Sequence, residues 1–241
     1  MFCDKIIEGL RFVNLSTADR LRERLMECPI FEITNVSDYM YKENPQEDWV
    51  IHKDIPNMSP PFRECWFEWT SPEYVNSENT IKKMNIRIRK GVYFKAMEMP
   101  ENMRDENTKN AKWIINCACF TLSGVRALFF GVTPIIVMPE GNPKAFMVGG
   151  KDICGAPKEF QGMSEEDNSQ FVTVLKMFGI IVGLAISFLH CKNVTTTEKT
   201  YPPKLQKARQ KRKKPQFLEY HMLEIHPMKK VLETEGNSRK T

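Results

Sequence analysis

The amino-acid sequence predicts an α+β fold in which a mostly antiparallel sheet packs against one long buried helix. Residues 84–89 alternate apolar and polar side chains, as a half-buried antiparallel strand requires. Short strand-like runs separated by turn signals follow within residues 113–138. A 19-residue apolar run from Phe171 to Leu189 is then long enough for a helix buried in the protein interior.

Length and composition fit one globular domain. The chain has 241 residues, of which 41% are hydrophobic and 27% charged, within the usual range for soluble proteins. We assign residues 1–230 to a single domain and residues 231–241 to a flexible C-terminal tail. The seven cysteines are scattered and odd in number, which favours reduced thiols over a disulfide scaffold. No signal-peptide pattern is visible at the N-terminus, so we expect a cytoplasmic protein.

The N-terminal quarter predicts one helix followed by irregular chain. Ser16 is suited to cap a helix over about residues 17–28, whose apolar positions recur at helical spacing. Residues 30–61 show no period and contain four prolines, so we expect irregular, surface-crossing chain there. The aromatic run from Phe62 to Trp69 is typical of a strand.

The middle of the chain predicts an antiparallel meander. After the strand at 84–89, Gly91 is expected to mark a bulge or turn before the next strand-like run, 92–94. Turn signals at 123–124 and 131–134 are expected to separate three further strands. These strands lie at 113–122, 125–130 and 135–138, and a short one is expected at 144–148.

The apolar run from Phe171 to Leu189 has two interpretations. It approaches the roughly 20 residues that cross a bilayer, and small residues recur in it at every fourth position. Against a membrane span, Lys176 would lie within the bilayer at a cost, and a long preceding segment would have to cross without a signal sequence. We favour a helix over about 164–190 buried against the sheet, with the membrane span as the alternative.

The main functional signal is a cationic segment between Glu198 and Glu219. It contains eight basic residues and no acidic one, whereas the formal net charge of the whole chain is +5. Pro203 and Pro215 are placed to open and close a short basic helix, and residues 217–225 are expected to follow as an edge strand. The residues that we assign to binding are Lys204, Lys207, Arg209, Lys211, Arg212, Lys213 and Lys214, with Arg87 and Arg89 as an extension on the strand at 84–89. A solvated surface helix is the alternative interpretation.

Other patterns favour no catalytic or metal site. Glu64 and Glu68 lie among aromatic residues, where a desolvated carboxyl could serve as a general acid. In a half-buried strand, however, Glu68 is expected to point to solvent while Phe67 and Trp69 point inward. The spacing of cysteines and histidines matches no zinc motif. We therefore assign no catalytic residue, no metal and no cofactor.

Two blocks of the chain resemble uncharacterised proteins encoded by phages and bacterial genomes. The first block is Pro60-Pro61-Phe62 followed by Cys65-Trp66-Phe67-Glu68-Trp69. The second is Phe188-Leu189-His190-Cys191-Lys192-Asn193-Val194, then Pro203, the Arg/Lys run to Pro215, and Tyr220-His221-Met222-Leu223-Glu224-Ile225. The resemblance implies a soluble intracellular protein whose basic segment is docked and whose last strand joins the sheet. It implies no activity.

These observations favour a non-enzymatic binding protein that uses the basic segment to contact nucleic acid or an acidic protein surface. Two alternatives stay open. One is an enzyme acting on a nucleotide or phosphorylated substrate, with Arg87, Arg89 and a strand carboxylate in a cleft. The other is a phage-encoded inhibitor that acts by occupying a host protein.

Overall fold

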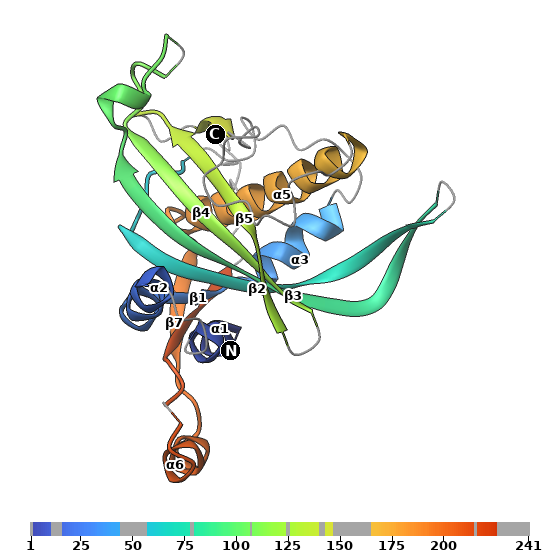
Figure 1. The fold of residues 1–241 in the computed structure, drawn as a ribbon, viewed down its shortest axis with the longest axis vertical. Coiled ribbons are helices and arrows are strands. Elements are labelled where there is room, and N and C mark those ends of the chain that lie inside the picture. The colour runs from blue at the N-terminus through green and yellow to red at the C-terminus, as the bar shows by residue number, and fades with distance from the viewer. Residues whose placement is uncertain are drawn as a thin grey trace, which may run out of the picture.

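The computed structural model consists of a strongly twisted eight-stranded sheet with helices on both faces (Figure 1). It describes residues 2–10, 16–43, 57–77, 80–106, 108–123, 126–139, 143–146, 165–214 and 216–225. The strand order is β6-β5-β4-β3-β2-β1-β8-β7. All neighbours pair antiparallel except β1, which runs parallel to both β2 and β8. The predicted α/β class with a mostly antiparallel sheet is confirmed.

The N-terminal region holds three helices and a short strand. These elements are α1 (Phe2–Leu10), α2 (Ser16–Glu27), β1 (Ile30–Glu32) and α3 (Thr34–Glu43). The predicted helix at 17–28 is confirmed by α2, but the prediction of irregular chain was wrong for β1 and α3. A strand of three residues is too short to show a period, and β1 is held by pairing with β2 and β8. Helix α1 was not predicted.

The central strands are longer than the sequence indicates. They are β2 (Glu64–Ser77), β3 (Thr80–Glu98), β4 (Trp113–Ser123), β5 (Arg126–Val137) and β6 (Pro143–Phe146), with a short helix η1 (Glu101–Met103) between β3 and β4. The expected break at Gly91 was wrong, because β3 passes straight through this residue. The expected turn at 131–134 was also wrong. Gly131 has φ 153° and lies in β5 opposite Cys119, where the register of β4 and β5 shifts by a bulge.

Gly91 is required because a large side chain lies directly on the β3 backbone. A Cβ atom at this position would lie 2.2 Å from Cζ2 of Trp66 and 3.0 Å from Cδ1 of Phe2. Its hydrogen atom in place of a side chain therefore lets Trp66 and α1 approach the sheet. The glycine serves close packing, not a turn.

The sheet is covered on both faces, so it has two cores. One core lies between the sheet and helices α3 and α5 and contains Phe67, Trp69 and Phe178. The other lies between the sheet and helices α1 and α2 and contains Trp66 and Phe2. Consecutive residues of β2 therefore enter different cores, which explains why Phe62 to Trp69 reads as a continuous aromatic run.

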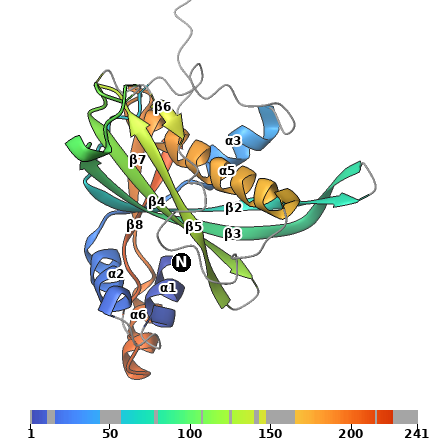
Figure 2. The same cartoon turned by 45° about the horizontal axis from the view of Figure 1, so that its top comes forward.

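Helix α5 runs from Glu165 to Leu189 and crosses the face of the sheet that α3 also covers (Figure 2). Its described side chains between Val174 and Ser187 are buried or half-buried, and those of residues 165–173 lie outside the described set. Within the described part of the chain, no helix combines the length and the hydropathy that a membrane crossing demands.

The C-terminal part forms a strand, a helix and a second strand: β7 (Val194–Lys199), α6 (Pro203–Lys211) and β8 (Tyr220–Ile225). The helix opening at Pro203 is confirmed, whereas Pro215 and the tail 231–241 lie outside the described residues. The final strand was wrongly expected at an edge. β8 is inserted between β1 and β7, and its Leu223 is 2% exposed, so the threonine-rich β7 forms the edge of the sheet.

Candidate binding surface on the arm between β7 and β8

The basic segment forms an arm, residues 200–219, that connects β7 to β8 and carries α6. Pro203 lies in the first turn of α6, where its missing N–H leaves no hydrogen bond unmade. The backbone N–H groups of Leu205 and Gln206 donate to the carbonyl of Pro202 at 2.9 and 3.2 Å. Figure 1 shows α6 at the far end of the arm, away from the sheet, and none of its residues is buried. The arm therefore displays its helix to solvent.

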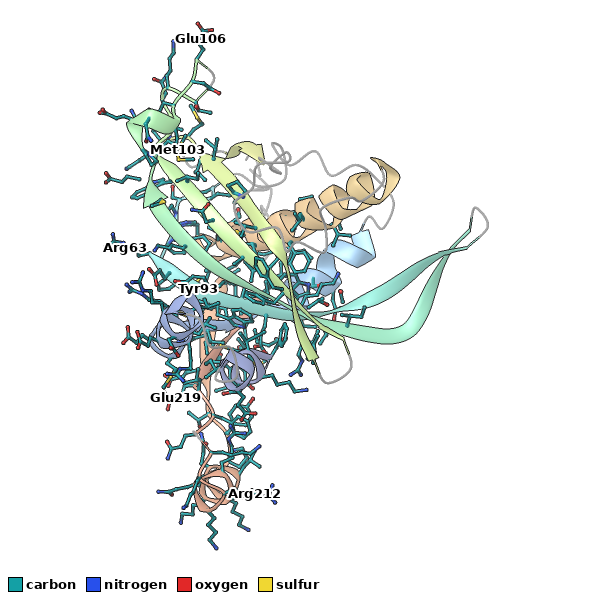
Figure 3. The ribbon with its side chains drawn as sticks, in the orientation of Figure 1. Arg63, Tyr93, Met103, Glu106, Arg212 and Glu219 are labelled. Atoms are coloured by element: carbon teal, nitrogen blue, oxygen red, sulfur yellow. The ribbon has the colours of Figure 1, made fainter. Side chains whose placement is uncertain are left out.

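The end of α6 is closed by a Schellman motif. Lys213 adopts the left-handed conformation, with φ 55°, and its N–H donates to the carbonyl of Gln210 at 3.0 Å. The N–H of Lys214 donates to the carbonyl of Arg209, also at 3.0 Å. These bonds satisfy carbonyls that a helix end otherwise leaves unpaired. They also place three exposed cations, Arg212, Lys213 and Lys214, around the negative end of the helix dipole (Figure 3 labels Arg212).

The base of the arm is fixed by contacts to Phe217. The side-chain amide of Gln206 donates to the Phe217 carbonyl at 3.0 Å, and the Phe217 N–H donates to Oε1 of Gln206 at 2.8 Å. Tyr201 stacks on the Phe217 ring at 4.3 Å between centroids. The guanidinium of Arg209 lies 4.0 Å from the centroid of the same ring and forms an ion pair with Glu8 of α1. The helix is therefore held in a defined position relative to the body.

The predicted binding cations divide into two groups. Arg209 is engaged by Glu8 and Phe217, and its side chain is 13% exposed. The other six are exposed, and none of them forms an ion pair with a carboxylate of a described residue. These six residues are Lys204, Lys207, Lys211, Arg212, Lys213 and Lys214. Composition alone could not separate Arg209 from the others, although its helical phase, on the same side as Gln206, is a signal that could have done so.

The two strand arginines are not part of this group of exposed cations. The side chain of Arg87 lies outside the described set. Arg89 is half-buried on β3, opposite Thr70 of β2. Burial raises the pKa of Glu32 and of Tyr201, and the positive charge of Arg89 opposes both shifts. Arg89 therefore acts on buried groups under α1 and at the base of the arm.

The expectation that Glu68 faces solvent was wrong. Glu68 is 3% exposed, and its carboxylate accepts hydrogen bonds from the N–H groups of Phe2 and Cys3 at 3.1 and 3.0 Å. It also accepts one from Nε1 of Trp66 at 3.1 Å. Glu68 thus caps the N-terminus of α1, where a negative charge is favoured. Sequence reasoning missed this role because it did not predict α1.

Glu64, the second carboxylate considered for catalysis, lies in a mixed-charge furrow between α2 and the sheet. It accepts a hydrogen bond from the Tyr93 hydroxyl at 2.7 Å and lies 3.8 Å from both Arg24 and Lys95. Two adjoining hollows there, of about 510 and 710 Å³, share Arg24, Glu27 and Lys95 in their walls. Figure 3 shows Arg63 and Tyr93 on this side of the molecule. Because both signs of charge line the furrow, it is less suited to a polyanion than the arm is.

Thiols and metal-binding groups add no further site among the described residues. Six cysteines there are free, and burial raises the pKa of Cys28 to about 12, so its thiol is unreactive near neutral pH. No three His, Cys, Asp or Glu side chains in the described part of the chain gather as a metal ion requires.

Comparison of the chain with protein-family models, with curated proteins and with solved structures finds no match.

Proposed function

We propose that this is a soluble, cytoplasmic, non-enzymatic binding protein whose arm contacts a polyanionic partner, either nucleic acid or an acidic protein surface. The observation that carries the proposal is the set of six exposed cations on the arm, which have no partner among the described carboxylates. The proposal includes α5 as a long helix buried for its full length, which leaves the arm as an appendage of a stable body.

The arrangement of the arm supports binding in two ways. Contacts of Gln206 and Arg209 with Phe217 fix the helix before a partner arrives, so little conformational entropy is lost on association. Exposed cations of one sign raise the local concentration of an anionic partner and accelerate its encounter. Each exposed charge contributes little alone, about 1 kcal/mol or less, so the effect depends on several acting together.

The proposal is tested by reversing four of the exposed charges, at Lys204, Lys207, Lys211 and Arg212, to glutamate. Association with duplex DNA, RNA or a polyglutamate peptide is measured by fluorescence anisotropy at about 50 mM salt. We expect the reversal to weaken the bound probe by at least about 100-fold, because an attraction becomes a repulsion. A second variant with glutamine at the same positions keeps helix-forming residues and should show a smaller loss in the same direction.

The matched control reverses four exposed cations elsewhere, Arg20, Arg63, Lys109 and Lys192. Its formal charge changes by the same amount, so a long-range effect of net charge would act equally on both variants. We expect the control to keep most of the wild-type affinity. Equal losses in the two variants, or no binding of any probe by the wild-type protein, would contradict the proposal.

A second candidate function, catalysis on a phosphorylated substrate, is favoured by one observation. The carboxyl group of Glu32, whose pKa burial raises, interacts electrostatically with Arg89 on a neighbouring part of the sheet. In such an enzyme Arg89 would bind the phosphate and Glu32 would act as general acid. Loss of turnover in Glu32→Gln, with substrate affinity retained, would support this function over binding alone.

A further inference from the structure

The exposed face of α6 carries a straight row of lysines. Lys204, Lys207 and Lys211 are spaced by three and four residues, which places them on one side of a helix. Gln206 and Arg209, which bind Phe217, fall on the opposite side. The helix therefore turns its polar anchors toward the base of the arm and its lysines outward. We call these three lysines the lysine ridge, and Arg212, Lys213 and Lys214 the tip.

The dimensions of the ridge match a nucleic-acid backbone. Seven residues of helix span about 10 Å, since each residue advances the helix by about 1.5 Å. A double helix of that length carries about six phosphate charges, because one occurs for about every 1.7 Å of its axis. The ridge and the tip together supply six exposed cations. Charge and length are therefore complementary to a short stretch of duplex.

We infer that the arm binds the sugar–phosphate backbone of double-stranded nucleic acid without reading its sequence. This inference rests on the proposed function and narrows its partner. Recognition of base edges depends mainly on the forked groups of arginine, asparagine and glutamine. The ridge consists of lysines, which act as point charges and bind phosphates in any sequence. Arg212 is the one arginine among the six exposed cations.

A single strand is a poorer partner for this surface. Proteins that bind single strands offer aromatic rings on which unpaired bases stack. On the arm, the rings of Tyr201 and Phe217 stack on each other, and Arg209 covers Phe217 as well. These rings are therefore occupied at the base of the arm, away from the lysine ridge.

An acidic protein surface is also less suited to the ridge. The centres of protein interfaces are enriched in aromatic residues, methionine and arginine and depleted in lysine. The exposed part of α6 offers one large apolar side chain, Leu205, which is 43% exposed. Such a surface can attract an acidic protein but has little apolar area to bury against it.

The inference is tested by fluorescence anisotropy with two unrelated duplexes of about 20 base pairs, one of their single strands, and a polyglutamate peptide, from about 50 to 200 mM salt. We expect the two duplexes to bind within about threefold of each other and more tightly than the single strand. Six phosphate contacts predict a slope of about −5 for log affinity against log salt. Lys207→Gln and Lys211→Gln should each reduce that slope by about one, whereas the control Arg63→Gln should leave it unchanged.

Arg209→Gln separates positioning from direct contact. This change removes the guanidinium that stacks on Phe217 and pairs with Glu8, so we expect weaker binding with an unchanged salt slope. Tighter binding of the single strand, or a difference of more than about tenfold between the duplexes, would overturn the inference. If polyglutamate binds through the ridge and the duplexes do not, the inference fails but the proposed function stands. If no probe responds to the charge-reversed arm, both fail.

Discussion

Two neighbouring glutamates show how environment assigns different roles to the same side chain. Glu32 and Glu68 are directly opposite each other on the parallel strands β1 and β2. Glu68 accepts three N–H donors and caps α1, so its charge is supported. Glu32 accepts hydrogen bonds from the hydroxyl and N–H of Thr34. Neither role could be predicted from the sequence, because the donors for Glu68 come from the opposite end of the chain's N-terminal half.

The pH dependence of stability should reveal the burial of Glu32. Burial raises its pKa in the folded protein above the value of 4.5 expected when unfolded. Between these two pKa values the folded state binds more protons than the unfolded state, so this group's contribution to stability falls as pH rises. Glu32→Gln keeps the shape and removes the titration. We expect wild type to lose stability relative to this variant as pH increases above about 4.5.

Urea unfolding of both proteins across this pH range provides the measurement, read as the difference between them. The difference cancels Asp4, whose pKa burial also raises and which is present in both proteins. Glu23→Gln on the exposed face of α2 serves as control, because that carboxylate is exposed and its replacement should leave the pH profile parallel to wild type. A constant difference between wild type and Glu32→Gln at all pH values would show that Glu32 is not desolvated on folding.

At the scale of elements, the sequence predicts long regular segments well and short or doubly buried ones poorly. Helices α2 and α6 and the strands β4 and β6 were predicted near their observed positions. β1 and β7 were missed: β1 has three residues, and β7 is a polar edge strand without an apolar face. Glycine was misread at Gly91 and Gly131, since it permits both turns and close packing within a strand. Sequence alone does not distinguish these uses.

Gly91→Ala should test the close packing of α1, β2 and β3. The added methyl group would lie 2.2 and 2.8 Å from two atoms of the Trp66 indole, which is fully buried and cannot move freely. Overpacking of this kind costs about 1–3 kcal/mol, and we expect the upper end because the contact is so short. Thermal or urea unfolding gives the change in the free energy of unfolding.

Two companion variants make the result specific. Gly9→Ala in α1 places a Cβ with no neighbour within 4 Å, so it should stabilise the helix by up to about 1 kcal/mol. Gly91→Ala combined with Trp66→Leu should lose less stability than the two single changes added together, because the smaller side chain relieves the contact. Additive losses would mean that the indole does not lie against Gly91.

At the scale of the whole molecule, the protein divides into a body with two buried cores and a charged arm. The location of the binding charges could be predicted, since composition alone singles out the segment between Glu198 and Glu219. Their geometry could not be predicted in full. The docking of Arg209 depends on Glu8, which is 201 positions away in the chain, and on a ring that follows the helix. Long-range contacts of this kind decide which cations face solvent.

This division predicts that the arm can be removed without unfolding the body. We propose to replace Pro202 to Gln216 by Asn-Gly, a pair that favours tight turns and joins Tyr201 to Phe217, whose rings already lie 4.3 Å apart. Because no residue of α6 is buried and the main loss is the Arg209–Glu8 pair, stability should change by about 1 kcal/mol or less. Circular dichroism should show a cooperative melt close to that of wild type, while duplex binding is lost. Unfolding of the shortened protein would instead mean that the arm is needed for the fold, and retained duplex binding would place the polyanion site on the body.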